Sequence, residues 1–161
     1  MRAFTLVEIL VSFTILSLII AGIYAVSHIA DVNWNTETAL LDLQQQVRLA
    51  MDGMTREIRQ TAPGDITVSS GGGRVDFQVP GASDTVGYYL QGNRIIREHP
   101  TDTTKVIANE ISSLNFCCVG GASCTDCSAA GAVRVQIQGA RTVKGQTTTF
   151  PLTDKIMLRN E

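Results

Sequence analysis

The chain has 161 residues, 44% of them hydrophobic, and a net charge of −2 at neutral pH. This length suits one modest domain, and the part outside the apolar N-terminal segment, about 130 residues, is long enough to bury a core. A slightly acidic chain without any run of basic residues lacks a general electrostatic means of holding nucleic acid. No nucleic-acid partner is therefore expected.

The first predicted element is an apolar helix. Residues 9–30 form a run of 22 residues without a formal charge. At about 1.5 Å per residue, such a helix crosses a hydrocarbon core of roughly 30 Å. Arg2 precedes this run, and Asp31, Glu37 and Asp42 follow it. Because positive charge favours the cytoplasmic side, we expect a single-pass helix with a cytoplasmic N-terminus.

Two other interpretations of this helix are a removed secretory signal peptide, cut near residues 25–27, and a plain membrane anchor. Glu8 argues against the signal peptide, because a signal peptide keeps its charge in a basic leader. An acidic group inside a membrane helix costs free energy and is a functional candidate. Glu8 therefore favours a helix that is retained and has a specific role.

The residues around Glu8 form an ordered motif directly before the apolar run: Ala3-Phe4-Thr5-Leu6-Val7-Glu8. This motif resembles the leader of the type IV pilin and type II secretion pseudopilin superfamily, in which a small residue precedes Phe-Thr-Leu-x-Glu. The resemblance implies that a prepilin peptidase cuts between Ala3 and Phe4 and methylates the new amine of Phe4. Two departures are Ala3 in place of the usual glycine and a leader of only three residues.

The resemblance also implies a role and partners for Glu8. A lone carboxylate among packed apolar helices is unfavourable unless it meets a cation. In this family the cation is the N-terminal amine of a neighbouring subunit. The implied partners are the prepilin peptidase, an inner-membrane assembly platform, major and minor pilins or pseudopilins, and membrane lipid before assembly. The implied locations are the bacterial inner membrane, with a periplasmic head, and then a type IV pilus or type II secretion pseudopilus.

An amphipathic helix is predicted after the membrane segment, over residues 31–62. Apolar residues recur there at helical spacing: Leu40, Leu43, Val47, Met51, Met54 and Ile58. We interpret this stripe as a core seam rather than a coiled coil, because the heptad pattern is short. Residues 33–38 are predicted to form a bend, and Pro63 and Gly64 to end the helix near Gln60. The string at residues 51–60 is similar to W-type minor pilins and J-type pseudopilins.

Residues 63–161 are predicted to form a β-rich head domain. Short alternating segments are separated by glycine-rich turns, such as the turn at residues 71–73. Residues 86–90 and 94–98 read as a hairpin, and further strands are expected at 66–69, 75–79, 114–118, 133–137 and 155–158. Strands that follow one long helix suggest an antiparallel sheet wrapped on it. The predicted fold class is therefore α+β and pilin-like, with residues 1–3 as leader and 4–30 as the transmembrane or filament-core helix.

Four cysteines lie within eleven residues: Cys117, Cys118, Cys124 and Cys127. In an oxidising periplasm disulfides are the default. Adjacent residues of a strand point to opposite faces, so Cys117 and Cys118 are not expected to pair with each other. Two connectivities remain open. One alternative is a four-thiolate metal site, of which Cys124 and Cys127 supply one of the two usual Cys-x-x-Cys pairs. The other alternative is redox chemistry or free thiols.

The sequence predicts no catalytic site and no cofactor. His28 falls at the end of the apolar segment and His99 precedes Pro100, and neither belongs to a recognisable nucleophile–histidine–acid motif. The glycine cluster at 71–73 lacks the lysine of a phosphate-binding loop. The favoured hypothesis is a structural filament subunit. The alternative is a membrane-anchored periplasmic binding module with a cysteine-stapled or metal-binding loop.

Overall fold

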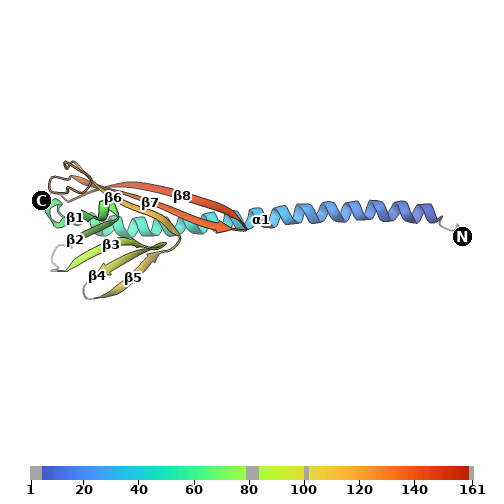
Figure 1. Ribbon diagram of the computed structural model, residues 1–161, viewed down its shortest axis with the longest axis horizontal. Helices are drawn as coiled ribbons and strands as arrows, with labels where there is room; N and C mark the ends of the chain where they lie inside the picture. The colour runs from blue at the N-terminus through green and yellow to red at the C-terminus, as the bar shows by residue number, and fades with distance from the viewer. Residues whose placement is uncertain (1–4, 79–83, 100–101, 160–161) are drawn as a thin grey trace. The chain divides into compact units, whose positions relative to one another are not determined.

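The computed structural model describes residues 5–78, 84–99 and 102–159. The chain divides into two units, residues 1–38 and residues 39–161. Helix α1 (Leu6–Ile58) begins in the first unit and ends in the second, and antiparallel strands follow it (Figure 1). This order confirms the predicted α+β class, with one long N-terminal helix and antiparallel β-structure.

In the first unit, residues 6–30 of α1 are apolar apart from Glu8, His28 and a few hydroxyl residues, and their side chains are exposed. Their large apolar side chains are exposed all around the helix, from Leu6 at 81% to Ile29 at 60%. By length and composition this helix is able to cross a membrane. Soluble monomers rarely expose so large a contiguous apolar surface, so this segment requires lipid or other protein around it.

The predicted bend at residues 33–38 is wrong, because these residues are helical. Their polar side chains bond back to the carbonyls of the preceding turn, a pattern that an α-helix accommodates. Asn35 Nδ2 donates to the Asp31 carbonyl at 2.6 Å, and Thr36 Oγ1 donates to the Val32 carbonyl at 2.9 Å. Thr38 bonds to the Trp34 carbonyl in the same way.

In the second unit, residues 39–58 of α1 present one buried face to the strands. The predicted stripe is buried from Leu43 onward, whereas Leu40 is half-buried and Ala39 and Ala50 complete the face. The helix ends at Ile58, followed by a turn at residues 59–60. The stripe is therefore a core seam, as the sequence indicated.

Five strands form one antiparallel sheet in chain order. They are β1 (Ile66–Ser69), β2 (Arg74–Gln78), β3 (Thr85–Gln91), β4 (Arg94–His99) and β5 (Asp102–Ala108). The hairpin of β3 and β4 is confirmed. Strand β5 was not predicted, because its first residues are polar and it pairs only along one edge, with β4, where irregular register interrupts the ladder.

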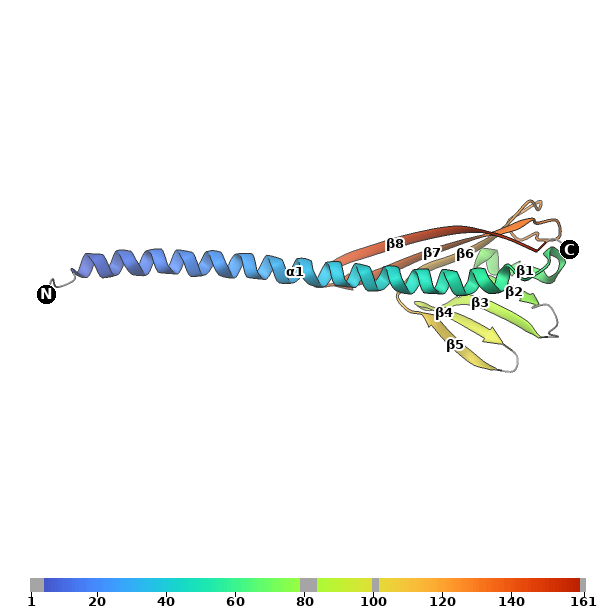
Figure 2. The ribbon, with the colours of Figure 1, turned by 180° about the vertical axis from the view of Figure 1, so that it is seen from behind.

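Three longer strands form a second antiparallel sheet: β6 (Ile111–Val119), β7 (Ala132–Val143) and β8 (Gln146–Met157). The expectation of one sheet is therefore corrected to two, which contact each other along β6 and spread to either side of the helix segment of this unit in Figure 2. Strand β8 begins well before the predicted residue 155. It contains Pro151, which an edge strand tolerates because its missing N–H costs no ladder bond on the open side.

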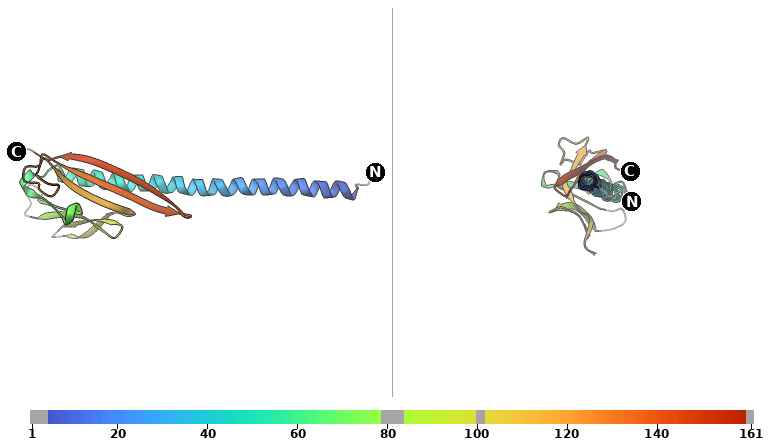
Figure 3. Two further views of the ribbon diagram at one scale, coloured as in Figure 1. Left: turned by 45° about the horizontal axis from the view of Figure 1, so that its top comes forward. Right: turned by 90° about the vertical axis from the view of Figure 1, so that its right-hand side faces the viewer.

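Two glycines stand where different elements of this unit approach closely. Gly72, at φ +104°, ends the short 3₁₀ turn η2 (Ser70–Gly72), where a Cβ atom would lie 2.9 Å from the Phe116 carbonyl oxygen. A Cβ on Gly139 would lie 2.7 Å from Leu43 Cδ1. Figure 3 shows β7 and β8 running along the helix segment against which Gly139 packs. The glycine-rich turn of the first sheet thus packs against β6 of the second sheet, and β7 lies directly on α1.

Candidate functional site

The structure gives Glu8 a local role in starting α1. Thr5 Oγ1 accepts a hydrogen bond from the Glu8 N–H at 3.3 Å, and Glu8 Oε2 accepts from the Thr5 N–H at 3.4 Å. This reciprocal pair is a capping box, which satisfies two of the unpaired N–H groups at a helix N-terminus. The Thr-x-x-Glu spacing before an apolar run is a sequence signal for a capping box. This capping role was not predicted from the sequence.

The side chains around Glu8 are apolar on the same stretch of helix. Glu8, Ile9, Ser12 and Phe13 line a surface hollow of about 320 Å³. Ser12 Oγ donates to the Glu8 carbonyl at 2.7 Å, so its hydroxyl is turned to the backbone. Among the described residues that line this hollow, Glu8 is therefore the one with a charged side chain. The processing residues Ala3 and Phe4 lie outside the described residues.

The four cysteines form two disulfides in the structure, Cys117–Cys124 and Cys118–Cys127. The vicinal residues do not pair, as the strand geometry predicted, because Cys117 lies opposite Arg134 on the exposed face of β7 and Cys118 lies opposite buried Val133. The structure thereby selects one of the two connectivities that the sequence left open. Both bridges pin the loop between β6 and β7.

Asp126 organises the loop between the two bridges. Its carboxylate accepts hydrogen bonds from the Ser128 hydroxyl at 2.7 Å, the Ser128 N–H at 3.1 Å and the Ala122 N–H at 3.2 Å. The bonds from Ser128, and then the one from Ala122, hold the pKa of Asp126 below its ordinary value. The loop of small residues therefore has its own polar framework in addition to the disulfides.

A polar cluster ties α1 to the five-stranded sheet. The Tyr88 hydroxyl donates to Glu57 Oε2 at 2.9 Å, and Arg97 Nε donates to the same oxygen at 3.1 Å. Tyr88 is 2% exposed. Burial first, and then the charge of Glu57, raise the pKa of Tyr88 well above the tyrosine range. For Arg97, burial works to lower the pKa, but the hydrogen bond and charge of Glu57 outweigh it.

We expect Tyr88 to make the stability of the C-terminal unit pH-dependent in alkali. Because its pKa is raised in the folded state, its contribution is complete below about pH 10 and is lost as the pH rises through the folded pKa. Unfolding free energies measured by denaturant titration should therefore fall above about pH 10 in the wild type and fall less in Tyr88→Phe. Equal alkaline slopes in the two proteins would contradict the assignment.

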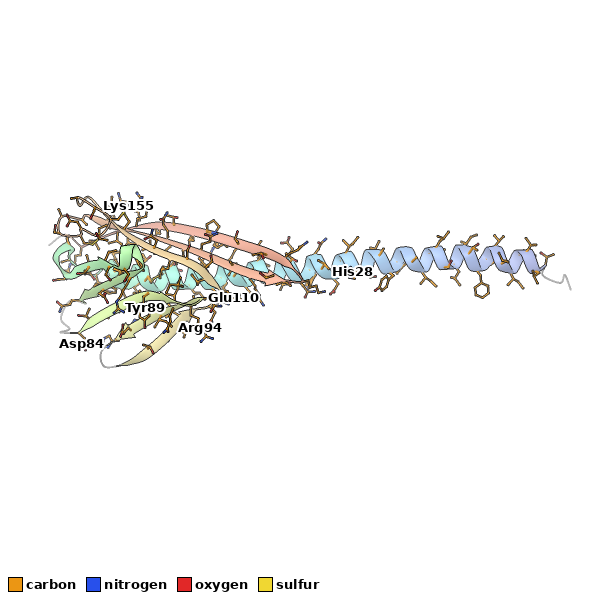
Figure 4. The ribbon with its side chains drawn as sticks, in the orientation of Figure 1. His28, Asp84, Tyr89, Arg94, Glu110 and Lys155 are labelled. Carbon is orange, nitrogen blue, oxygen red and sulfur yellow. A yellow bond between two sulfur atoms is a disulfide. The ribbon has the colours of Figure 1, made fainter. Side chains whose placement is uncertain are left out.

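A second polar cluster lies on the outer face of the five-stranded sheet. Arg74 Nη2 is 2.7 Å from Asp76 Oδ1 and 2.8 Å from Glu98 Oε2, and its guanidinium lies 4.9 Å from the centre of the Tyr89 ring. Figure 4 shows Tyr89 on this sheet. The three ion-paired residues and His99 border a surface hollow of about 470 Å³. Both carboxylates are engaged by Arg74, which makes the cluster an ion-pair network across strands.

The predicted site residues are divided between the two units. Glu8 belongs to the first unit, whereas the four cysteines belong to the second. The two histidines, to which the sequence assigned no role, are divided in the same way, with His28 in the first unit and His99 in the second. Within the described ranges, no three histidine, cysteine, aspartate or glutamate side chains are grouped so that they could hold a metal ion. The chemical features that stand out are thus the carboxylate at the start of α1 and the doubly bridged loop.

Comparison with known proteins gives one match. Residues 1–24 match the family model of the prokaryotic N-terminal methylation motif, the signal of type IV pilin-like proteins. No curated protein matches the chain. The motif covers Ala3, Phe4 and Glu8 and points to a structural subunit rather than an enzyme, with the apolar helix as a membrane anchor. It supports a precursor of the type IV pilin or pseudopilin kind.

Proposed function

We propose that this chain is a minor pilin or pseudopilin, a structural subunit of a type IV pilus or a type II secretion pseudopilus. One observation carries the proposal: an apolar helix surface that none of the described residues covers, with one carboxylate, Glu8, at its start. A hydrocarbon bilayer covers such a surface before assembly, and the helices of neighbouring subunits cover it afterwards. The string at residues 51–60 favours the subgroup of W-type minor pilins and J-type pseudopilins.

In this proposal a prepilin peptidase removes residues 1–3 and methylates Phe4. Residues 4–30 form the membrane and filament-core helix, residues 31–62 its amphipathic continuation, and residues 63–161 the periplasmic head. The N-terminus faces the cytoplasm before cleavage. The other partners are the inner-membrane assembly platform and the major and minor subunits of the same filament.

Glu8 has two roles in this proposal, and they are separable. As a capping residue it bonds to the Thr5 N–H within its own chain. As a charge it pairs with the amine of a neighbouring subunit, which meets it at the hollow beside Ile9 and Phe13. Glutamine is able to serve in a capping box, but it carries no charge and so leaves an incoming amine without a counter-ion.

Incorporation into filaments distinguishes the two roles. Glu8→Gln, like Glu8→Ala, is expected to insert into the membrane normally and to enter sheared filaments at a small fraction of the wild-type level. Thr5→Ala removes the capping hydroxyl at a cost of about 1 kcal/mol and keeps the charge, so it should still be incorporated. Quantitative immunoblots of filament and membrane fractions measure both. Normal incorporation of Glu8→Gln would refute the charge-pairing role.

Mass analysis of the mature N-terminus tests the wider proposal. A chain that begins with methylated Phe4 is expected in cells that contain the peptidase. An intact Met1 would instead favour a membrane-anchored periplasmic binding module, and a start near His28 would favour a secreted product. Either of these results would overturn the filament proposal.

A further inference from the structure

The two disulfides differ in their access to solvent. Cys118 and Cys127 are each 4% exposed and belong to the hydrophobic core. Cys124 is exposed and Cys117 is half-buried. Attack on a disulfide requires a nucleophile to reach one of its sulfur atoms. The outer bridge, Cys117–Cys124, therefore meets a condition for exchange that the inner bridge, Cys118–Cys127, does not.

The outer bridge also lies at the end of a basic row. Cys117 pairs with Arg134 in the β6–β7 ladder, and Arg134 pairs with Lys155 in the β7–β8 ladder. Residues directly opposite one another share a face of the sheet. Figure 4 shows Lys155 on the outer side of this sheet. Two like charges placed directly opposite each other destabilise a sheet, so folding alone does not account for the pair.

Among the described residues, acidic groups do not neutralise this row. The nearby positions on the same face are occupied by uncharged residues, among them Ser113, Asn115, Gln136, Gln138, Pro151 and Thr153. Among the ion pairs of the described residues, none involves Arg134 or Lys155. Asp154 is on the other face, where its carboxylate is 3.5 Å from the Thr55 hydroxyl. Asp126, in the loop itself, keeps its negative charge, but its oxygens accept hydrogen bonds from Ser128 and Ala122, and the ion pairs of the described residues include none between it and Arg134 or Lys155.

We propose that the outer bridge is a thiol-exchange site for low-molecular-weight thiols that carry negative charge. The incoming thiolate attacks Sγ of Cys124, the exposed sulfur. The Cys117–Cys124 bond breaks, and its electron pair leaves on Sγ of Cys117 as a thiolate. The product is a mixed disulfide at Cys124, and the thiol itself is the only co-reactant.

The cations explain both the direction and the selectivity of this exchange. A positive neighbour stabilises a thiolate and makes it the better leaving group, so Arg134 favours departure of Cys117 over departure of Cys124. The same charges attract an anionic thiol. The inner bridge and the hydrogen bond from the Cys118 N–H to the Cys124 carbonyl, at 2.9 Å, keep the loop in place. The site therefore accepts a thiol without unfolding the unit.

The first test uses the full-length protein in detergent and needs no variant. The protein is incubated with glutathione, quenched by alkylation at intervals and mapped by mass spectrometry. The expected early product carries glutathione on Cys124, an alkylated Cys117 and an intact inner bridge. Opening of the inner bridge first, or an adduct on Cys117, would overturn the proposal.

The second test varies charge on both sides. Mercaptoacetate, mercaptoethanol and cysteamine are compared at equal thiolate concentration, and each rate is divided by the rate of the same thiol with a small uncharged disulfide, because a more basic thiolate attacks faster whatever its charge. The normalised rates at the outer bridge should fall in that order, with about a two- to fivefold step per charge. Arg134→Gln should reduce both the rate and the advantage of mercaptoacetate. Arg94→Gln is the matched control, because it removes one exposed positive charge from the other sheet. Equal slowing in the two variants, or no dependence on thiol charge, would contradict the proposal.

Discussion

Phe116→Ala is expected to destabilise the C-terminal unit by about 3–5 kcal/mol, the usual cost of truncating a buried phenylalanine. Phe116 is fully buried, with 0% exposure, on the strand of the second sheet that contacts β1 to β4 of the first. Its loss opens a cavity where the two sheets meet. Since domains are stable by only about 5–15 kcal/mol, chemical unfolding of the full-length protein, followed by near-ultraviolet circular dichroism, should show a large shift of the midpoint.

Two further variants separate the cavity from other effects of substitution. Phe116→Leu preserves most of the volume and should cost less than about 1.5 kcal/mol. Ser113→Ala lies on the exposed face of the same strand, where substitutions stay within about 0.5 kcal/mol. If Phe116→Ala proved no more costly than Ser113→Ala, the described packing between the sheets would be wrong.

The helix was predictable from sequence because its signals are local and strong. Two patterns indicate a helix over several turns each: a run of 22 uncharged residues, and an apolar stripe from Leu43 to Ile58. The bend at 33–38 failed for a local reason as well. Asn35 and Thr36 have low helix propensity, but their side chains bond back to the Asp31 and Val32 carbonyls, which only the structure reveals.

The division of the strands into two sheets depends on long-range packing, which short alternating patterns do not record. The break follows β5, where the chain reaches Glu110 in a positive-φ conformation and starts β6 at Ile111. Alternation indicates which residues of a strand are buried, but not which strand lies beside it. The sequence therefore predicted most of the strands, but it could not specify their grouping.

At the cysteine loop, the sequence predicted which disulfide does not form, but it did not predict which two disulfides do. Strand geometry alone was enough to exclude a bond between Cys117 and Cys118, and the choice of partners required the path of the loop through Asp126. The basic pair beside the outer bridge depends on the register between β7 and β8. Arg134 and Lys155 are distant in sequence, and nothing in their surroundings marks them as neighbours.

The largest effect expected at the surface between helix and sheet comes from Gly139→Val. A Cβ atom at this position would lie 2.7 Å from Leu43 Cδ1 and 3.0 Å from Val47 Cγ2, and both side chains are fully buried. The added methyl groups have to push β7 and α1 apart or force off-rotamer side chains. Such overpacking typically costs about 1–3 kcal/mol, measurable as a lower unfolding midpoint and faster hydrogen exchange of the β7 amides.

Gly53→Ala provides a control with the opposite sign. Gly53 is exposed within α1, and a Cβ atom there would have nothing within 4 Å. Alanine in place of an exposed helical glycine stabilises a helix by about 1 kcal/mol, so this variant should raise the midpoint whereas Gly139→Val lowers it. Tolerance of valine at residue 139 would mean that β7 does not lie directly on the Leu43 and Val47 face, and the packing of this sheet on α1 would have to be redrawn.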